Sequence, residues 1–177
     1  MNHFRLLGHL DTTDLLVSLH SRRREWDAIT LRQDTPGSPH RDTRSIFLRG
    51  PEAPTPVTWF QDVPHKDYPL LSEWPEAQAI LETVNAAVPG QLGKVMLIEL
   101  KPGGALAWHI DQGPYSEQHL RLHLPVITNP GAMLYSGGEA VHLPVGLLTE
   151  FDNTSLHSAA NFGEYPRVHL VIDVRKG

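Results

Sequence analysis

The chain has 177 residues, with 15 Lys and Arg, 20 Asp and Glu, 11 His and no Cys. This length supports a hydrophobic core, and a hydrophobic fraction of 40% is typical of a folded protein. The lack of Cys excludes disulfides, thiolate metal sites and a cysteine nucleophile. A net charge of −5 with dispersed signs argues against a nucleic-acid partner. Because no apolar run reaches the roughly 20 residues of a membrane helix and no secretory signal opens the chain, we expect a cytoplasmic protein without membrane contact.

The N-terminal half predicts two helices joined by loops. Residues 11–14 supply N-cap side chains ahead of an amphipathic helix. Strands are expected over residues 44–49 and, inside a proline-rich stretch, over residues 57–60. The second helix is expected over residues 72–87, where an apolar stripe ends at Pro89-Gly90.

The half that follows Gly93 predicts β-structure. Turn sequences such as Pro102-Gly103-Gly104 separate short apolar runs. We expect strands over residues 95–100, 105–110, 120–127, 132–135, 140–143, 147–151 and 167–174. Short strands at this spacing predict an antiparallel sandwich or barrel such as a jelly roll. The sequence therefore predicts a mainly β fold in one domain, residues 1–177, in which a mixed helical segment over residues 1–92 packs on a β segment over residues 93–177.

Among the histidines, the His-x-Asp motif suggests one arm of a metal site, because residues i and i+2 of a strand point to the same side. The motif occurs at His40, His65 and His109. The first two lie in loops without a further ligand nearby. The third, His109-x-Asp111, ends a strand of the β half, where a rigid sheet can hold a site in place.

A third ligand has to come from a distant segment of the chain, and His157 is our candidate because it follows a predicted strand in a polar segment. Two His and one Asp form the facial triad of non-haem Fe(II) oxygenases. Ten residues later, Arg167 opens an apolar strand, where an arginine is costly unless it pairs with an anion. A buried arginine near such a triad suits a dicarboxylate.

These motifs together resemble the aspartyl/asparaginyl β-hydroxylase family of 2-oxoglutarate oxygenases. The resemblance covers about residues 93–175 and rests on His109-x-Asp111, Arg121-x-His123, His157-x-x-x-Asn161 and Arg167-x-His169; residues 40–49 resemble an N-terminal motif of small bacterial members. It implies a double-stranded β-helix, a cupin-like jelly roll, that holds Fe(II) with His109, Asp111 and His157. It also implies that Arg167 binds 2-oxoglutarate, that O2 is consumed, and that Arg121 and His123 complete the cosubstrate site or face the substrate carboxylate.

Asp111 separates this chain from the animal aspartyl hydroxylases, which have glycine there, so the chain resembles the bacterial enzymes with a full triad. The substrate is then an amino acid or an amino-acid residue in a peptide. Candidate substrate residues adjoin the metal arm or the N-terminal motif: His40, Thr43, Arg49, Trp108 and His119, besides Arg121. Asn161 and Ser158 are candidates for orienting His157. A homodimer is one way to close the pocket of so short a chain.

Two other functions remain open from the residues. A cupin-type metalloprotein of another reaction class, such as an isomerase or a cosubstrate-free dioxygenase, could use His109 and His157, but it normally has His where Asp111 stands and gives Arg167 no role. A non-catalytic jelly-roll binding module would leave the coincidence of the triad and Arg167 unexplained. The hydroxylase is therefore the favoured function.

Overall fold

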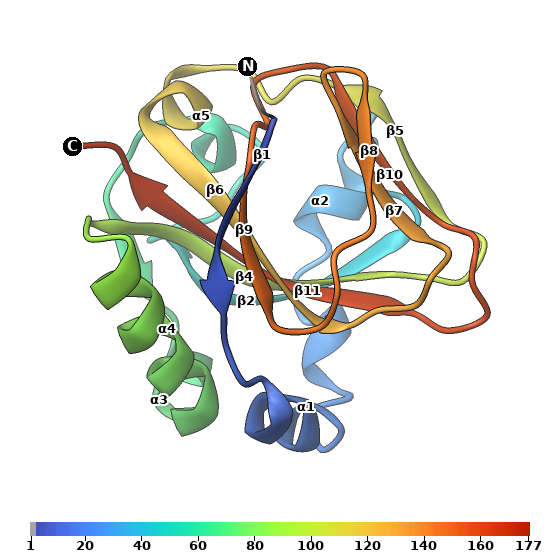
Figure 1. Ribbon diagram of the computed structural model, residues 1–177. Coiled ribbons are helices and arrows are strands. Elements are labelled where there is room, and N and C mark those ends of the chain that lie inside the picture. Colours follow the sequence, from blue (N-terminus) through green and yellow to red (C-terminus); the bar gives the residue numbers. More distant parts are fainter. Residues whose placement is uncertain (1–2) are drawn as a thin grey trace.

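The computed structural model describes residues 3–177, which form two antiparallel sheets that face each other, with helices on one side (Figure 1). The larger sheet has seven strands in the order β1-β9-β6-β11-β4-β2-β3, and the smaller sheet has four in the order β5-β10-β7-β8. This arrangement confirms the predicted mainly β fold of the jelly-roll type. The strands are β1 Phe4–His9, β2 Thr43–Pro51, β3 His65–Asp67, β4 Leu92–Leu100, β5 Ala105–His109, β6 His119–Ile127, β7 Ala132–Ser136, β8 Glu139–Val141, β9 Leu147–Phe151, β10 His157–Asn161 and β11 Arg167–Arg175.

The helices are short apart from α4. They are α1 Thr13–Leu19, α2 Leu31–Asp34, α3 Pro69–Ser72, α4 Pro75–Ala87 and α5 Pro114–Gln118, with 3-10 turns η1 Glu25–Asp27 and η2 Thr58–Phe60. Helices α1, α3 and α4 gather on the face of the larger sheet that points away from the smaller one (Figure 1). Helix α2 lies apart from them, near the space between the sheets.

The larger sheet has two faces of different character, because side chains alternate along each strand. On the helix face, Leu170 and Ile172 of β11 pack with Leu122 of β6 and with Leu81 of α4 in the main hydrophobic core. The opposite side of the same strands, which we call the inward face, points toward the smaller sheet. There β11 carries Arg167, His169, Val171 and Asp173, all buried. The main hydrophobic core therefore lies on one face of the sheet, and the buried polar side chains of β11 lie on the other, beside a smaller apolar cluster that includes Val171.

Several elements differ from the sequence-based expectation. The expected strand over residues 57–60 is wrong, since these residues contain the 3-10 turn η2, whose Trp59 packs against Phe47 at a ring distance of 4.8 Å. The helix expected over residues 72–87 begins at Pro75, which fits the N-terminal turn that proline prefers. Strands β1, β3 and β10 and helices α2, α3 and α5 were not expected. Strands β1, β2 and β3, all from the N-terminal half, extend the larger sheet at both ends.

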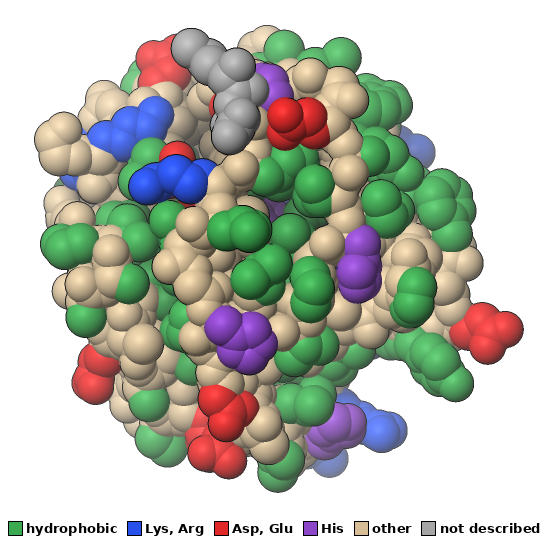
Figure 2. All heavy atoms as spheres, viewed as in Figure 1, with side chains coloured by type: hydrophobic (Ala, Val, Ile, Leu, Met, Phe, Trp, Pro, Cys, Tyr) green, Lys and Arg blue, Asp and Glu red, His purple; other side chains and the backbone are tan. Residues whose placement is uncertain are grey.

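Within residues 3–177, no helix is long and apolar enough to cross a membrane. On the face shown in Figure 2, Lys and Arg side chains do not form a continuous patch, and acidic side chains lie among them.

Candidate metal centre and adjoining cavity

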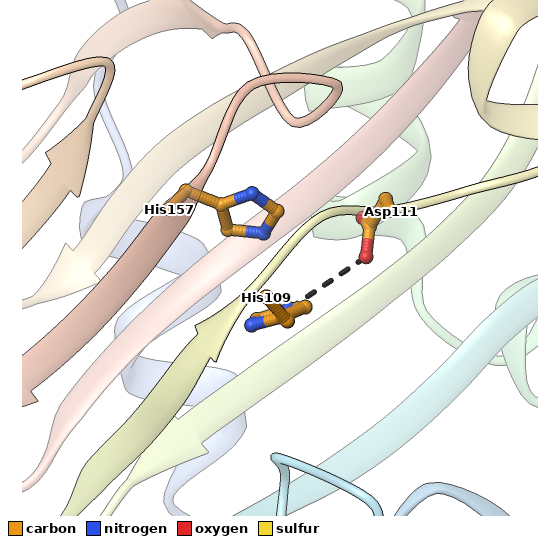
Figure 3. Close-up of side chains that lie close together, drawn as sticks. All are labelled: His109, Asp111 and His157. Carbon is orange, nitrogen blue, oxygen red and sulfur yellow. Dashed lines mark ion pairs between the residues drawn. The ribbon is translucent and has the colours of Figure 1, made fainter.

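The three side chains singled out as a metal set lie together at the open end of the two sheets. His109 ends β5, Asp111 follows two residues later, and His157 begins β10 (Figure 3). Strands β5 and β10 pair antiparallel with His109 directly opposite His157. One ligand atom from each of the three residues lies within 4.8 Å of the others. Imidazole nitrogens and a carboxylate are a donor set for a divalent transition metal, and three ligands leave coordination positions open.

Backbone contacts fix both imidazole rings in an orientation suited to a metal. His109 Nδ1 lies 2.7 Å from the carbonyl oxygen of Ala107, and His157 Nδ1 lies 2.9 Å from that of Ser155. Each Nδ1–H therefore donates to a carbonyl, which leaves each Nε2 as the free lone pair. Burial lowers the pKa of His157, so this ring is neutral and able to ligate at neutral pH.

Asp111 is held through one carboxylate oxygen. Its Oδ2 accepts hydrogen bonds from the Arg121 guanidinium and, at 3.0 Å, from the Asn153 amide, while Oδ1 lies 3.6 Å from His109 Nε2. The Asp111 amide also donates to the Asn153 carbonyl at 3.0 Å. Burial opposes ionisation of Asp111, but the neighbouring Arg121 and the Asn153 hydrogen bond outweigh it and hold its pKa below the ordinary value. The carboxylate is thus charged, with Oδ1 turned to the histidines.

Arg121 belongs to a charged row across the inward face. It donates to both oxygens of Asp173 at 2.9 Å, and the Tyr115 hydroxyl donates to Asp173 at 3.0 Å. Burial disfavours the charged guanidinium, yet Asp173 and Asp111 raise the Arg121 pKa above its ordinary value. Arg121 is therefore fully paired with these two carboxylates.

Arg167 lies farther along β11 on the same inward face, six residues or about 20 Å of strand from Asp173. It is 3% exposed, and its Nε and Nη1 have no hydrogen-bond partner among the described residues. Burial lowers its pKa to about 10, so it stays charged at neutral pH. An orphaned, buried guanidinium is costly and fits an anionic ligand.

His123 and His169 lie on the inward face between Arg167 and the triad. Their Nδ1 atoms are 3.1 Å apart, and the His123 ring packs edge-on against Phe151 at 5.1 Å, as the His157 ring does. Burial and the charge of Arg167 lower the pKa of both rings well below the ordinary value. These neutral rings form a polar path from the triad to the guanidinium.

A cavity of about 580 Å³, which we call the main cavity, opens beside the triad. Its walls include His109, Asp111 and Arg121, and His40, whose ring meets His109 edge-on at 5.5 Å. Helix α2, the turn η2 and strand β4 contribute Leu31, Arg32, Trp59, Phe60, Lys94 and Met96, and much of the rest of the lining comes from the loop over residues 35–39. Of the predicted substrate residues, His40 and Arg121 thus reach this cavity.

The structure places the other predicted substrate residues elsewhere. Arg49 donates to the carbonyls of Leu92 and His65 and pairs with Asp67 at 2.5 Å, so all its contacts lie at the far edge of the sheet. Thr43 is buried and donates to the His40 carbonyl. Trp108 is 57% exposed beside Tyr135, and His119 stacks on Tyr115 at 4.0 Å. None of these four lines the main cavity described above.

The two residues expected to orient His157 also make other contacts. The Asn161 amide donates to the carbonyls of Leu100 and Tyr165, which closes the turn between β10 and β11. Ser158 donates to the Leu106 carbonyl across the small sheet. The Ser155 carbonyl, not Asn161 or Ser158, holds the His157 ring.

Sequence reasoning missed four charged or polar residues at the site: Arg32, Lys94, Asn153 and Asp173. Asp173 sits two residues before the end of the last strand, where period-two alternation with Ile172 and Val174 could have placed it opposite the apolar face. In the same way, alternation with Val95 could have placed Lys94 on the face opposite the apolar one. For Arg32 and Asn153 the sequence holds no such pattern, because Arg32 lies in the four-residue helix α2 and Asn153 in a loop.

Comparison with known proteins finds a matching family model and a curated relative. Residues 12–177 match the family model of the aspartyl/asparaginyl beta-hydroxylases. The chain is 27% identical over 149 residues to L-proline cis-4-hydroxylase of Rhizobium meliloti (strain 1021), covering 84% of this chain and 47% of that protein. The chain therefore spans about half the length of this curated relative.

Two solved structures share the fold over almost the whole chain. A prolyl hydroxylase of Trichoplax adhaerens, in complex with a peptide fragment of hypoxia inducible factor, has a TM-score of 0.61 at 11% identity and covers 99% of this chain and 84% of its own. The viral collagen prolyl hydroxylase of Paramecium Bursaria Chlorella virus-1, in complex with 2-oxoglutarate, has a TM-score of 0.58 at 10% identity, with 99% and 97% covered. At such identities these likenesses show the fold alone. The family match over nearly the full length is what assigns the chain: it belongs to the aspartyl/asparaginyl beta-hydroxylase family.

Proposed function

We propose that this protein is an Fe(II)- and 2-oxoglutarate-dependent hydroxylase of an amino acid or of an amino-acid residue in a peptide. The observation that carries the proposal is the pairing of two features on one inward surface: three ligand atoms within 4.8 Å, and a buried guanidinium without a partner. A metal alone would account for His109, Asp111 and His157. The orphaned Arg167 calls for an anion as well, and a dicarboxylate cosubstrate supplies one.

Each residue near the metal has a task that follows from its contacts. His109, His157 and Asp111 Oδ1 would hold Fe(II), and Arg121 with Asn153 keeps Asp111 Oδ2 occupied, so that the carboxylate ligates through one oxygen. Bound Fe(II) and 2-oxoglutarate supply the oxidising chemistry, in which O2 and the keto acid give succinate and CO2 while a substrate C–H becomes C–OH. Arg167 would bind the distal carboxylate of the cosubstrate, and the neutral His123 and His169 line the way to it.

The relatives support an amino acid or a peptide residue as substrate. The curated relative is named for the hydroxylation of L-proline, and the main cavity of about 580 Å³ has room for a molecule of that size beside the triad. The cavity also opens to solvent, as a peptide substrate would require. A cupin-type enzyme of another reaction class would use the same triad but leave Arg167 unpaired.

The decisive experiment is an anaerobic titration of the metal-free protein with Fe(II) and then 2-oxoglutarate, followed by visible absorption. A keto acid chelated on non-haem iron gives a metal-to-ligand charge-transfer band, which we expect in the wild type and not in His157→Ala. Folded protein that binds Fe(II) without developing the band would refute the cosubstrate and favour the cupin-type alternative. Protein that binds no Fe(II) would leave only the binding-module function.

A further inference from the structure

Lys94 is a buried lysine whose amine makes no direct contact with a carboxylate among the described residues. It lies on β4 with its side chain on the inward face, and it is 3% exposed. Its Nζ sits 3.7 Å from the centre of the Tyr115 ring and 4.8 Å from that of Trp59, and the residue lines the main cavity. Among residues 3–177 we find no hydrogen bond or ion pair to Nζ. Two aromatic faces thus hold the ammonium group at the wall of the cavity.

The nearby carboxylates are already in use. Asp173, on the neighbouring strand β11, accepts two hydrogen bonds from Arg121 and one from Tyr115. Asp111 accepts from Arg121 and Asn153 and belongs to the triad. Neither acid pairs directly with Lys94, although the charge of Asp173 favours the protonated amine. Asp111 is the single acidic residue among the described residues that line the cavity.

Arg32 places a second cation on the cavity wall. It comes from α2, is half-buried, and its guanidinium contacts neutral groups: the Ser45 hydroxyl at 3.4 Å and the His40 ring at 3.0 Å. Because a guanidinium can only donate, the His40 nitrogen that it contacts must keep its lone pair, so this ring carries no charge. Burial lowers the pKa of Lys94 to about 7, Asp173 opposes this shift, and the positive charges of Arg121 and Arg32 add to it. A carboxylate bound beside Lys94 would favour its charged form.

The charges of the cavity therefore do not balance without a ligand. Arg32, Lys94 and Arg121 stand against Asp111 and Asp173, and a bound divalent metal adds further positive charge. An unpaired ammonium in a buried site is costly, and a carboxylate that binds there removes the cost. The apolar part of the lining includes Leu31, Trp59, Phe60 and Met96.

We propose that Lys94, with Arg32, forms the binding site for a carboxylate of the substrate, and that the substrate is a free apolar amino acid rather than an internal residue of a peptide. The inference rests on the proposed hydroxylase function and specifies its substrate. An internal apolar residue has no carboxylate to offer to Lys94. A free amino acid places its carboxylate on the two cations and its apolar side chain against Trp59 and Met96.

The test compares free apolar amino acids, L-proline among them, with their carboxamides. The readouts are succinate release and the shift of the charge-transfer band when the compound binds beside the metal. We expect at least one free acid to act and its carboxamide to fail. Lys94→Met should raise KM for that acid about 10- to 100-fold, as expected for a lost charged hydrogen bond. Arg32→Met should act in the same direction, which keeps the test valid if one variant does not fold.

Two controls separate this inference from the proposed function. Lys66→Met removes a lysine that is half-exposed on β3 and paired with Glu52, and it should leave KM unchanged. The charge-transfer band should form in Lys94→Met as in the wild type. Absence of the band from the wild type would refute the hydroxylase function itself. A normal band with unchanged KM in Lys94→Met, or with equal turnover of acid and carboxamide, or with no response to any free apolar amino acid, would overturn the carboxylate site alone.

Discussion

At the scale of single residues, the buried arginine of β11 gives the sharpest prediction. Arg167→Gln removes the charge that we assign to the cosubstrate while keeping a polar side chain. We expect the dissociation constant of 2-oxoglutarate to rise at least about 100-fold, since a buried charge-assisted contact contributes roughly 3 kcal/mol or more. The Fe(II) affinity should stay the same, because Arg167 touches no triad residue. Anaerobic titration of both ligands measures each constant separately.

The control for this change is Arg5→Gln, which removes an exposed arginine of the edge strand β1 that pairs with Glu150 of β9. Equal 2-oxoglutarate affinity in wild type and Arg167→Gln would remove the assigned role. A parallel loss of Fe(II) binding in Arg167→Gln would indicate a structural role for the guanidinium instead.

Asn153 yields a second residue-scale prediction as a positioning residue for Asp111. Its amide donates to Asp111 Oδ2, so Asn153→Ala leaves the carboxylate with Arg121 alone. We expect Fe(II) affinity to fall about 10-fold or somewhat more, as is typical for partners of metal ligands. Thr154→Ala, a change at the exposed neighbour, should leave the metal affinity intact. If Asn153→Ser keeps more of the Fe(II) affinity than Asn153→Ala does, the hydrogen bond to Asp111 rather than packing accounts for the effect.

At the residue scale, the sequence predicted site residues correctly where the two-residue repeat of a strand could be used. His109 and Asp111 were found because two residues of one strand share a side, and the structure brings both to His157. Arg49 and Trp108 were chosen by nearness in sequence to a motif, and each points away from the cavity. Nearness along a strand says nothing of which face a side chain takes, and neighbouring residues take opposite faces. Lys94 alternates with apolar residues along its strand, but no neighbouring motif in the sequence marks it as functional.

At the scale of elements, the helix face of the larger sheet contributes mainly to stability, and the inward face carries the residues of the proposed chemistry. Leu81 of α4 is 5% exposed in the core of the helix face, whereas the triad and the cavity lie on the inward side. We expect Leu81→Ala to lower the free energy of unfolding by about 2–5 kcal/mol, the range for a buried leucine. Fe(II) and 2-oxoglutarate affinities should not change in the folded fraction. Urea denaturation and the anaerobic titration test both statements.

Glu82→Ala is the matched control, since Glu82 is exposed on the same helix one residue farther on. It should shift the urea midpoint little. A large change of metal affinity in Leu81→Ala would contradict the separation of the two faces.

The elements that the sequence missed are those without an apolar alternation. Strand β10 reads His-Ser-Ala-Ala-Asn, and small residues there allow close packing between β5 and β7 rather than marking a strand. The expected strand over residues 57–60 combined β-favouring residues, yet tertiary contact of Trp59 with Phe47 fixes them as a 3-10 turn. The long strands β4, β6 and β11 were predicted well because one of their faces is continuously apolar.

At the scale of the whole molecule, three buried histidines are uncharged in the folded protein. Burial lowers the pKa of His40, His123 and His169 well below the ordinary value, so these rings are neutral in the folded protein. In the unfolded chain they regain a pKa near 6.5. Between the two values the unfolded chain binds more protons than the folded protein, so the free energy of unfolding rises with pH there and levels off above about 6.5.

We therefore expect the metal-free protein to lose stability as the pH falls from 6.5 to 5, by up to about 1.4 kcal/mol per pH unit for each such histidine. The depressed pKa values of Asp111 and Asp173 act in the same direction but mainly below pH 4, so the histidines dominate this window. Urea midpoints measured across the range test the slope. His169→Leu should flatten it, whereas the exposed His20→Leu, which also removes an imidazole, should not. Midpoints that stay constant between pH 5 and 6.5 would show that the inward face takes up protons without unfolding, and that its histidines are hydrated rather than buried.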